Sequence, residues 1–148
     1  MITGSLPSTF GGLSSIIDIY IDENYVSGSI PTCMGQLTTL IHLELFSNPL
    51  TGTIPSEVGY LTHLVDLYIC FSSLSGTFPS SLVGLTNLAN LCLHTNELTG
   101  TIPQDIDRMV SLEELQLEIN SFTGPIPSSL GLLPSLTTLT VSRLAIFD

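Results

Sequence analysis

Residues 37–60 read LTTLIHLELFSNPLTGTIPSEVGY, and the same frame of apolar, asparagine, glycine and proline positions returns along the whole chain. In this stretch the frame consists of Leu37, Leu40, Leu43, Leu45, Asn48, Leu50, Gly52, Ile54, Pro55 and Val58. Glycine recurs every 24 residues without an insertion or deletion, at Gly4, Gly28, Gly52, Gly76, Gly100 and Gly124. A fixed period of about 20–50 residues is typical of architectures in which each unit stacks on the next. The sequence therefore predicts a repeat array.

The repeats divide the chain into a single domain over residues 1–148. Residues 1–12 hold a partial repeat, residues 13–132 hold five full 24-residue repeats, and residues 133–148 hold a second partial repeat in which Leu144 replaces the asparagine and Asp148 the glycine. Terminal repeats normally carry polar caps, and none is recognisable here. We therefore interpret the chain as a fragment of a longer array or as a subunit whose ends a partner covers, and we expect uncapped ends to stack end to end.

Each letter of the frame has a physical reading. In a strand over residues 41–47, alternation sends Leu43 and Leu45 inward and His42, Glu44 and Phe46 outward. The asparagine that follows the strand can satisfy backbone groups of its own coil and of the neighbouring coil. Ser72 stands where an asparagine is expected, so the third coil is predicted to be a weak point.

The complete pattern, L-x-x-L-x-x-L-x-L-x-x-N-x-L-x-G-x-I-P-x-x-L, resembles the plant-type leucine-rich repeat of receptor-kinase ectodomains and polygalacturonase-inhibiting proteins. The resemblance covers essentially the whole chain. It implies an α/β repeat solenoid, right-handed and curved, with a parallel β-sheet on the concave face and a mostly irregular or 3-10 convex side. It also implies a non-catalytic recognition module for a protein or peptide in the extracellular space or at the cell surface. The chain itself shows no signal peptide, no Asn-x-Ser/Thr acceptor and an odd number of cysteines, three.

The charge balance restricts the partners. Thirteen acidic residues face only two basic ones, which gives a formal net charge of −11. Such a chain repels nucleic acid and anionic membrane surfaces and favours a basic protein or peptide. The apolar positions are too dispersed for a segment that inserts into a membrane.

The outward positions of the strands supply the candidate site. Strands placed side by side align carboxylates and aromatic rings in columns across the concave face, and exposed aromatics beside carboxylates have the composition of an anchor patch. We predict that this face binds the basic side chains of a partner; a solvated acidic face without a ligand is the alternative. The candidate residues are Asp18, Tyr20, Asp22, His42, Glu44, Phe46, Asp66, Tyr68, Phe71, His94, Glu114 and Glu118.

Two other functions remain open at this level. Threonines and serines flank the repeat glycines at Ser75, Thr77, Thr99 and Thr101, among others, and a ladder of this kind could bind ice or another surface, as some plant leucine-rich repeat antifreezes do. Threonine is ordinary in a short strand, however, and Pro125 interrupts the ladder. The third reading is a structural subunit packed in a larger assembly.

Catalysis and cofactors find little support. No glycine-rich phosphate loop is present, and the carboxylate pairs of the strands do not face one another, so we predict no enzymatic activity and no cofactor. Cys70, Cys92 and His94 could converge on zinc or copper, but no fourth ligand is evident and we predict no metal site. A Cys70–Cys92 disulfide is disfavoured because one strand across and two residues along separates the Cα atoms by about 8 Å.

Overall fold

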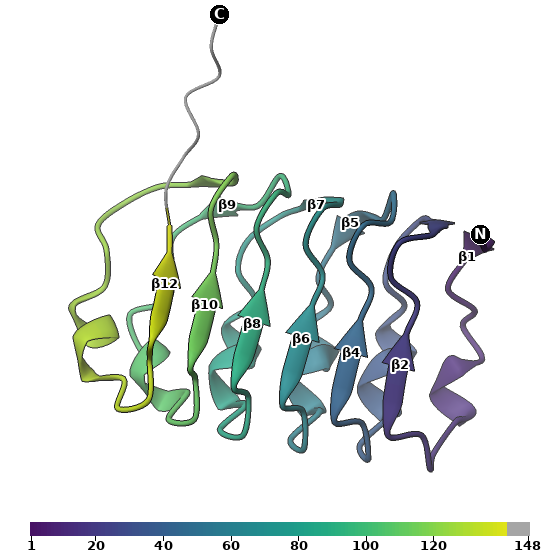
Figure 1. The fold of residues 1–148 in the computed structure, drawn as a ribbon, viewed down its shortest axis with the longest axis horizontal. Helices are drawn as coiled ribbons and strands as arrows, with labels where there is room; N and C mark the ends of the chain where they lie inside the picture. The colour runs from purple at the N-terminus through teal and green to yellow at the C-terminus, as the bar shows by residue number, and fades with distance from the viewer. Residues whose placement is uncertain (142–148) are drawn as a thin grey trace, which may run out of the picture.

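The strands of the repeat form one parallel sheet that runs the length of the molecule. The computed structural model describes residues 1–141; the predicted frame positions Leu144 and Asp148 lie outside them. One strand per coil enters a six-stranded sheet in the order β12-β10-β8-β6-β4-β2, so each strand pairs with that of the next coil (Figure 1). The strands are β2 Asp18–Tyr20, β4 His42–Glu44, β6 Asp66–Tyr68, β8 Asn90–Cys92, β10 Glu114–Gln116 and β12 Thr138–Thr140.

A second set of short strands follows the first around each coil. They are β1 Thr3–Ser5, β3 Tyr25–Ser27, β5 Thr51–Thr53, β7 Ser73–Ser75, β9 Thr99–Gly100 and β11 Ser121–Phe122. They pair as three separate two-stranded sheets, β1-β3, β5-β7 and β9-β11. Isolated bridges from Gly28 to Leu50 and from Thr77 to Thr99 connect these short sheets, so an interrupted second set of strands accompanies the main sheet over the described residues.

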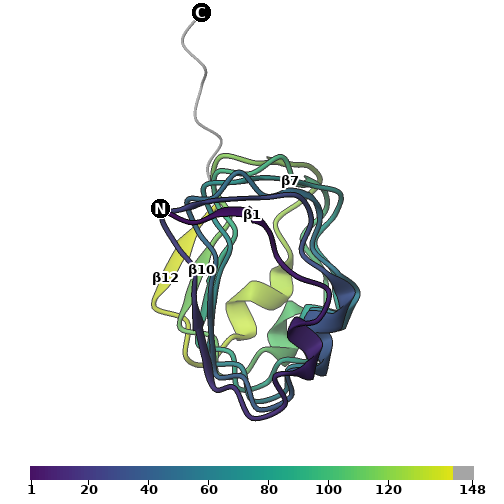
Figure 2. The same ribbon diagram turned by 90° about the vertical axis from the view of Figure 1, so that its right-hand side faces the viewer.

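Short 3-10 helices close the coils on the side opposite the main sheet (Figure 2). They are η1 Phe10–Gly12, η2 Thr32–Gln36, η3 Ser56–Tyr60, η4 Ser80–Gly84, η5 Ile106–Arg108 and η6 Ser128–Leu132. Four of them follow directly after a repeat proline in an extended conformation, Pro31, Pro55, Pro79 or Pro127. All helical turns of residues 1–141 are of the 3-10 type, which confirms the curved solenoid with a 3-10 convex side. None of these turns has the length and apolar character that a bilayer-crossing helix needs.

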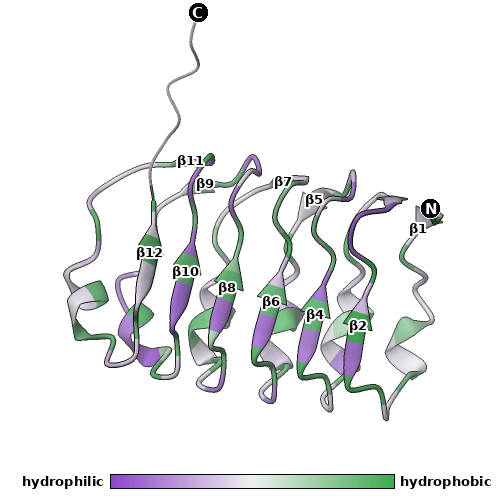
Figure 3. Cartoon of the chain, in the orientation of Figure 1, coloured by the Kyte–Doolittle hydropathy of each residue, from purple (hydrophilic) through white to green (hydrophobic). Residues whose placement is uncertain are grey.

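The core is the stack of inward-facing side chains enclosed by these coils. Leu43 and Leu45 are each 1% exposed, whereas their strand neighbours His42 and Glu44 are partly exposed, as the predicted alternation requires. Figure 3 shows the same alternation of hydropathy in β4, β6 and β10, whereas in β8 the hydrophilic Asn90 is followed by the apolar Leu91 and Cys92. The strand predicted over residues 41–47 is shorter, His42–Glu44, although the backbone N–H groups of Leu45 and Ser47 still donate to Tyr68 and Cys70 of the next coil. Each fully buried leucine stabilises the fold by about 1.5–3 kcal/mol before entropy is subtracted.

The asparagine after each strand ties consecutive coils together, as predicted. The side-chain amide of Asn48 donates to the carbonyl oxygens of Ile21, Leu45 and Phe46, and its oxygen accepts from the backbone N–H of Val26 at 2.9 Å. Asn24, Asn96 and Asn120 repeat this arrangement. Ser72 makes a single side-chain bond, from its hydroxyl to the carbonyl oxygen of Asn48 at 2.8 Å.

The residue before each of these positions adopts a left-handed backbone, which the sequence analysis did not anticipate. The five residues are Glu23, Ser47, Phe71, Thr95 and Ile119, with φ between 52° and 56°. Left-handed φ is unusual for residues other than glycine, asparagine and aspartate, and it is most costly for β-branched or bulky side chains. The tight turn that presents the asparagine to two coils therefore imposes strain, above all at Phe71 and Ile119.

Candidate functional site

The concave sheet arranges the predicted site residues in three parallel rows. Strand pairing places Asp18, His42, Asp66, Asn90 and Glu114 in row one, and Tyr20, Glu44, Tyr68, Cys92 and Gln116 in row two. Two residues beyond row two, backbone hydrogen bonds continue between the coils and align Asp22, Phe46, Cys70, His94 and Glu118 as row three. Every predicted site residue except Phe71 therefore lies in one of the three rows, and Phe71 follows Cys70 directly in the chain.

Row one is an internally paired network. His42 Nδ1 lies 2.5 Å from Asp66 Oδ2, and His42 Nε2 lies 3.9 Å from Asp18 Oδ1. The amide of Asn90 donates to the other oxygen of Asp66 at 2.6 Å. Both carboxylate oxygens of Asp66 thus contact neighbouring side chains. Asp66 is therefore less available to pair with a basic partner than the sequence predicted.

Row two places a carboxylate between two tyrosines. Glu44 lies in register with Tyr20 on one side and Tyr68 on the other. Burial raises the pKa of Glu44, and repulsion from Asp22 and Asp66 adds to the effect, against a smaller opposing effect of His42. Burial, followed by the charges of Asp66 and Glu114, raises the pKa of Tyr68 to about 12. Within the described residues Glu44 and Asp22 make no side-chain hydrogen bond or ion pair, so they are the carboxylates that a partner can reach without displacing an internal contact.

Row three brings an imidazole beside two thiols. The imidazole of His94 packs edge-on against Phe71, with ring centroids 4.6 Å apart, and its Nδ1 lies 2.9 Å from the hydroxyl oxygen of Thr95. Cys70 in row three and Cys92 in row two are both free thiols and both buried, although the sequence placed them on the outward side of the strands. Larger neighbours on the concave face cover the two small side chains.

The thiols of Cys70 and Cys92 influence each other's ionisation. The neighbouring thiol of Cys92 lowers the pKa of Cys70, whereas the neighbouring thiol of Cys70, together with burial, raises the pKa of Cys92. Ligand atoms of Cys70, Cys92 and His94 all lie within 4.8 Å of one another.

A hollow in the concave face collects much of the predicted site. It has a volume of about 400 Å³ and is lined in part by Asn90, Cys70, Cys92 and Gln116, which were not among the predicted contact residues. Their shared register with the predicted residues was the signal that could have identified them. The predicted residues that line it are Glu44, Phe46, Asp66, Tyr68, Phe71 and His94. The remaining predicted residues lie outside its lining; they are Asp18, Tyr20, Asp22, His42, Glu114 and Glu118.

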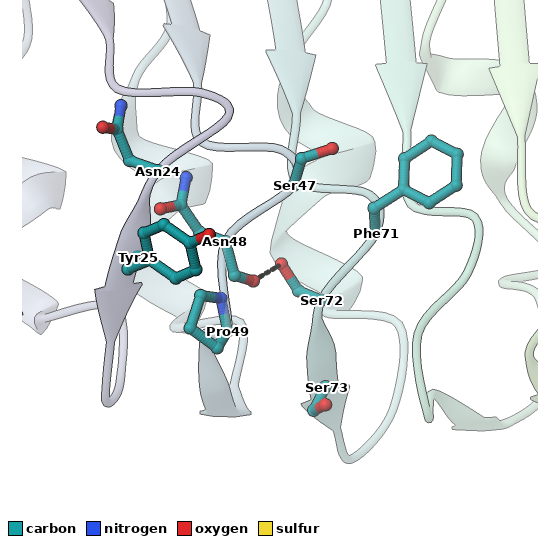
Figure 4. A pocket seen from close by; sticks show the side chains of 8 residues that line it. All are labelled: Asn24, Tyr25, Ser47, Asn48, Pro49, Phe71, Ser72 and Ser73. Atoms are coloured by element: carbon teal, nitrogen blue, oxygen red, sulfur yellow. Dashed lines mark hydrogen bonds between the residues drawn. The ribbon is translucent and has the colours of Figure 1, made fainter. Parts of the chain in front are cut away.

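A second hollow of about 400 Å³ lies at the ends of the strands, where Ser72 interrupts the asparagine row (Figure 4). Tyr25 and Pro49 line it together with Phe71, and the bond from Ser72 to Asn48 crosses its floor. Tyr25 is 55% exposed and was not predicted as a contact residue, because it belongs to the second strand of its coil rather than to the concave sheet. Phe71 borders both hollows and is 52% exposed.

The threonine and serine ladder lies on the second set of strands, beside the repeat glycines. These strands pair with an offset of 22 residues, so Thr51 lies opposite Ser73 and Thr53 opposite Ser75. One contact recurs along the ladder, in which the methyl groups of Thr53, Thr77 and Thr101 pack against Gly76, Gly100 and Gly124. The hydroxyls of Ser75, Thr99 and Thr123 each donate to the carbonyl oxygen of the preceding repeat glycine, so part of the ladder's hydrogen-bonding capacity is used internally.

Comparison with known proteins identifies the family. Two leucine-rich repeat models match adjacent stretches, residues 39–61 and 62–122, which together span more than half of the chain. No curated protein sequence matches the chain. The chain belongs to the leucine-rich repeat family, in its plant-type form.

The chain is also similar to solved structures of plant receptor ectodomains. One is the leucine-rich repeat ectodomain of the Arabidopsis thaliana membrane receptor kinase GASSHO1/SCHENGEN3 in complex with CASPARIAN STRIP INTEGRITY FACTOR 2, with 38% identity and a TM-score of 0.93. The ectodomain of the Arabidopsis receptor kinase HAESA in complex with an IDA peptide hormone shows 34% identity and a TM-score of 0.93. The plant peptide hormone receptor RGFR1, in complex with RGF2, shows 32% identity and a TM-score of 0.72. Each covers 95% of this chain, which spans only 17%, 24% and 27% of their respective lengths.

Proposed function

We propose that this chain is a non-catalytic recognition module that binds a basic peptide, or a basic segment of a protein, along its concave face. The observation that carries the proposal is the row of Tyr20, Glu44 and Tyr68, in which an internally unpaired carboxylate lies between two aromatic rings. A lysine or arginine can pair with such a carboxylate while its aliphatic stem packs on a ring.

The charge of the surrounding surface supports a cationic partner. Burial raises the pKa of Glu44, and repulsion from Asp22 and Asp66 raises this pKa further; a bound cation relieves that repulsion. Arg108, the one arginine of residues 1–141, is engaged with Asp105 at 3.5 Å beside η5. Within that range, histidine is therefore the basic side chain that the concave face itself supplies.

The similar ectodomains support a peptide as the ligand. The HAESA ectodomain was solved with a peptide hormone ligand, and that of the membrane receptor kinase GASSHO1/SCHENGEN3 with CASPARIAN STRIP INTEGRITY FACTOR 2. This similarity supports a location of the present chain outside the cell, as part of a surface receptor or a related secreted protein. Stacking of further coils, or of a partner, on the ends of the array belongs to the same proposal.

The test is selection from a library of extended synthetic peptides over the immobilised chain, with an otherwise identical library in which glutamine replaces lysine and arginine. We expect enrichment from the first library alone. Tyr68→Ala should then weaken binding of the selected peptide by about 1–3 kcal/mol, or roughly 5- to 150-fold. Glu44→Gln should mainly slow association and flatten its salt dependence.

Thr86→Ala is the matched control, because Thr86 is exposed, lies on a loop away from the three rows and makes no side-chain hydrogen bond. Its affinity should equal that of the unmodified chain. Equal enrichment from both libraries, or full affinity in both Tyr68→Ala and Glu44→Gln, would contradict the proposal.

A further inference from the structure

The strongest unassigned feature of the concave face is the cluster of Cys70, Cys92 and His94. Two positions of the repeat frame contribute to it. Cys70 of the third coil and His94 of the fourth coil occupy the same position, and Cys92 precedes His94 by two residues on the same side of the chain. Consecutive outward positions of one strand and the facing position of its neighbour can approach a common point. One ligand atom from each residue lies within 4.8 Å of the other two.

The sequence alone led us to predict no metal site here, but on the convergence of the three ligand atoms we propose that Cys70, Cys92 and His94 form a binding site for a thiophilic metal ion, Zn²⁺. Two thiolates and one imidazole are a ligand set that zinc proteins use with a fourth position left for water or another donor. With Zn–S bonds of about 2.3 Å and Zn–N bonds of about 2.0–2.1 Å, two ligands of a tetrahedral ion lie about 3.5–3.8 Å apart. Side-chain rotations that bring the atoms together by about 1 Å complete the site.

The surroundings of the imidazole favour ligation. The hydroxyl of Thr95 can accept a hydrogen bond from Nδ1–H of His94, which leaves Nε2 with its lone pair available for a metal. Phe71 packs edge-on against the same ring and restricts its orientation. A ligating histidine in proteins usually has its second nitrogen held in this way.

Metal binding fits the spacing of the thiols better than a disulfide does. Cys92 pairs in register with Tyr68, so Cys70 lies diagonally across from Cys92, and their Cα atoms are about 8 Å apart. A disulfide requires a Cα separation of at most about 7 Å. An ion between the sulfurs nearly doubles the sulfur-to-sulfur distance that can be bridged, from about 2.05 Å to almost 4 Å.

The fourth position opens toward the concave hollow. Cys70, Cys92 and His94 all contribute to the lining of the hollow of about 400 Å³. Glu118 follows His94 in row three, and its carboxylate accepts a hydrogen bond from Thr140, so its present contact directs it to the next coil. Water or a donor from a bound partner can therefore occupy the open position. The site itself does not depend on the identity of the partner of the concave face.

The experiment uses the full chain, reduced and freed of metal by a chelator. Titration with Zn²⁺ alone, followed by calorimetry in buffers of different ionisation enthalpy, should show one ion per chain and release of protons from the thiols. Co²⁺ in place of Zn²⁺ should give thiolate charge-transfer bands in the near ultraviolet and intense tetrahedral bands in the visible. Absence of stoichiometric uptake by the unmodified chain overturns the proposal.

Variants separate this site from adventitious binding. Cys92→Ser and His94→Gln should each weaken Zn²⁺ binding on the order of a hundredfold or more, since even loss of an outer partner of a ligand costs about 10- to 100-fold. Cys33→Ser is the matched control, because Cys33 lies on η2, outside the cluster. It should bind Zn²⁺ as the unmodified chain does.

The buried serine of the Cys92→Ser variant can disturb folding. Circular dichroism and thermal melting of each metal-free variant therefore establish whether the variant is folded before its Zn²⁺ affinity is compared. His94 is only half-buried, so His94→Gln should remain folded, and loss of binding in that variant alone already supports the site. Unchanged affinity in a folded His94→Gln overturns the proposal. Equal loss in Cys33→Ser also overturns it.

Discussion

Replacing Ser72 with asparagine should stabilise the protein, because position 72 is the one interruption in the row of asparagines from Asn24 to Asn120. The side chain of Asn48 makes four hydrogen bonds to backbone groups of two coils, whereas Ser72 makes one. The backbone N–H of Val26 donates a hydrogen bond to the side-chain oxygen of Asn48, and by analogy the N–H of Leu50 would donate to an amide oxygen at position 72. Instead, the N–H of Leu50 donates to the carbonyl oxygen of Asn48, only two residues earlier. The hollow beside Ser72 leaves room for the larger side chain.

The expected gain follows from these bonds. Ser72→Asn adds up to four hydrogen bonds and removes one, and each is worth about 0.5–1.5 kcal/mol net. Ordering the amide and giving up the two-residue turn at Leu50 offset part of this, which leaves about 1–2 kcal/mol. For a domain of this size that corresponds to a rise in Tm of roughly 3–8 °C.

Thermal melting followed by circular dichroism, with urea unfolding as a second measure, tests this value. Asn48→Ser is the reciprocal change and should lower the free energy of unfolding by about 2–4 kcal/mol, because it leaves the buried N–H of Val26 without an acceptor. If Asn48→Ser destabilises as expected but Ser72→Asn leaves Tm unchanged or lower, the idea that the third coil lacks an amide is wrong.

Three further predictions concern single positions. Leu91→Ala should lower the free energy of unfolding by about 2–5 kcal/mol, because Leu91 is 1% exposed and packed between two neighbouring coils. The control Thr86→Ala, at an exposed residue, should leave urea unfolding unchanged, and equal effects of the two changes would contradict the burial of Leu91 in the core. Ile119→Asn should raise the free energy of unfolding by about 1 kcal/mol, because asparagine tolerates the left-handed φ of 56° better than a β-branched residue does. The control Ile119→Val keeps the strain and should not raise the free energy of unfolding, so an equal gain in both variants would exclude strain as the cause. Because the folded state raises the pKa of Glu44, ionisation of Glu44 destabilises the fold as pH rises through that pKa. Glu44→Gln should therefore raise Tm at neutral pH and have a vanishing effect in acid, and a larger effect in acid would show that the pKa of Glu44 is not raised by folding.

The repeat frame predicted the fold in detail because it is set by nearest-neighbour geometry. Leucines in the columns of Leu43 and Leu45 can be buried in only one stacking register, and the 24-residue spacing fixes which outward residues become neighbours. The row of Tyr20, Glu44 and Tyr68 was therefore predicted correctly before any coordinates were considered. The identity of the bound partner stays a proposal, since it depends on a second molecule.

Features that depend on side-chain conformation could not be predicted. The pairing of Asp66 with His42 and Asn90 depends on rotamers, and alignment in one row did not reveal that this carboxylate is internally satisfied. The burial of Cys92 depends on how far larger neighbours extend over a small side chain. The left-handed turn at Phe71 has no sequence signal, because the residues at this position of the repeat share neither glycine nor asparagine.

The strictly sequential order of the main sheet has a mechanical consequence. Each strand from β2 to β12 is hydrogen-bonded only to the strands of adjacent coils, so no bond of the sheet spans two coils at once. When the protein is pulled along the stack, every coil bears the same force. We expect the less stable terminal coil to unfold first and its neighbour to follow. A ligand that lies across several strands would stabilise the array against such unfolding, since it contacts coils that the hydrogen bonds of the sheet do not connect directly.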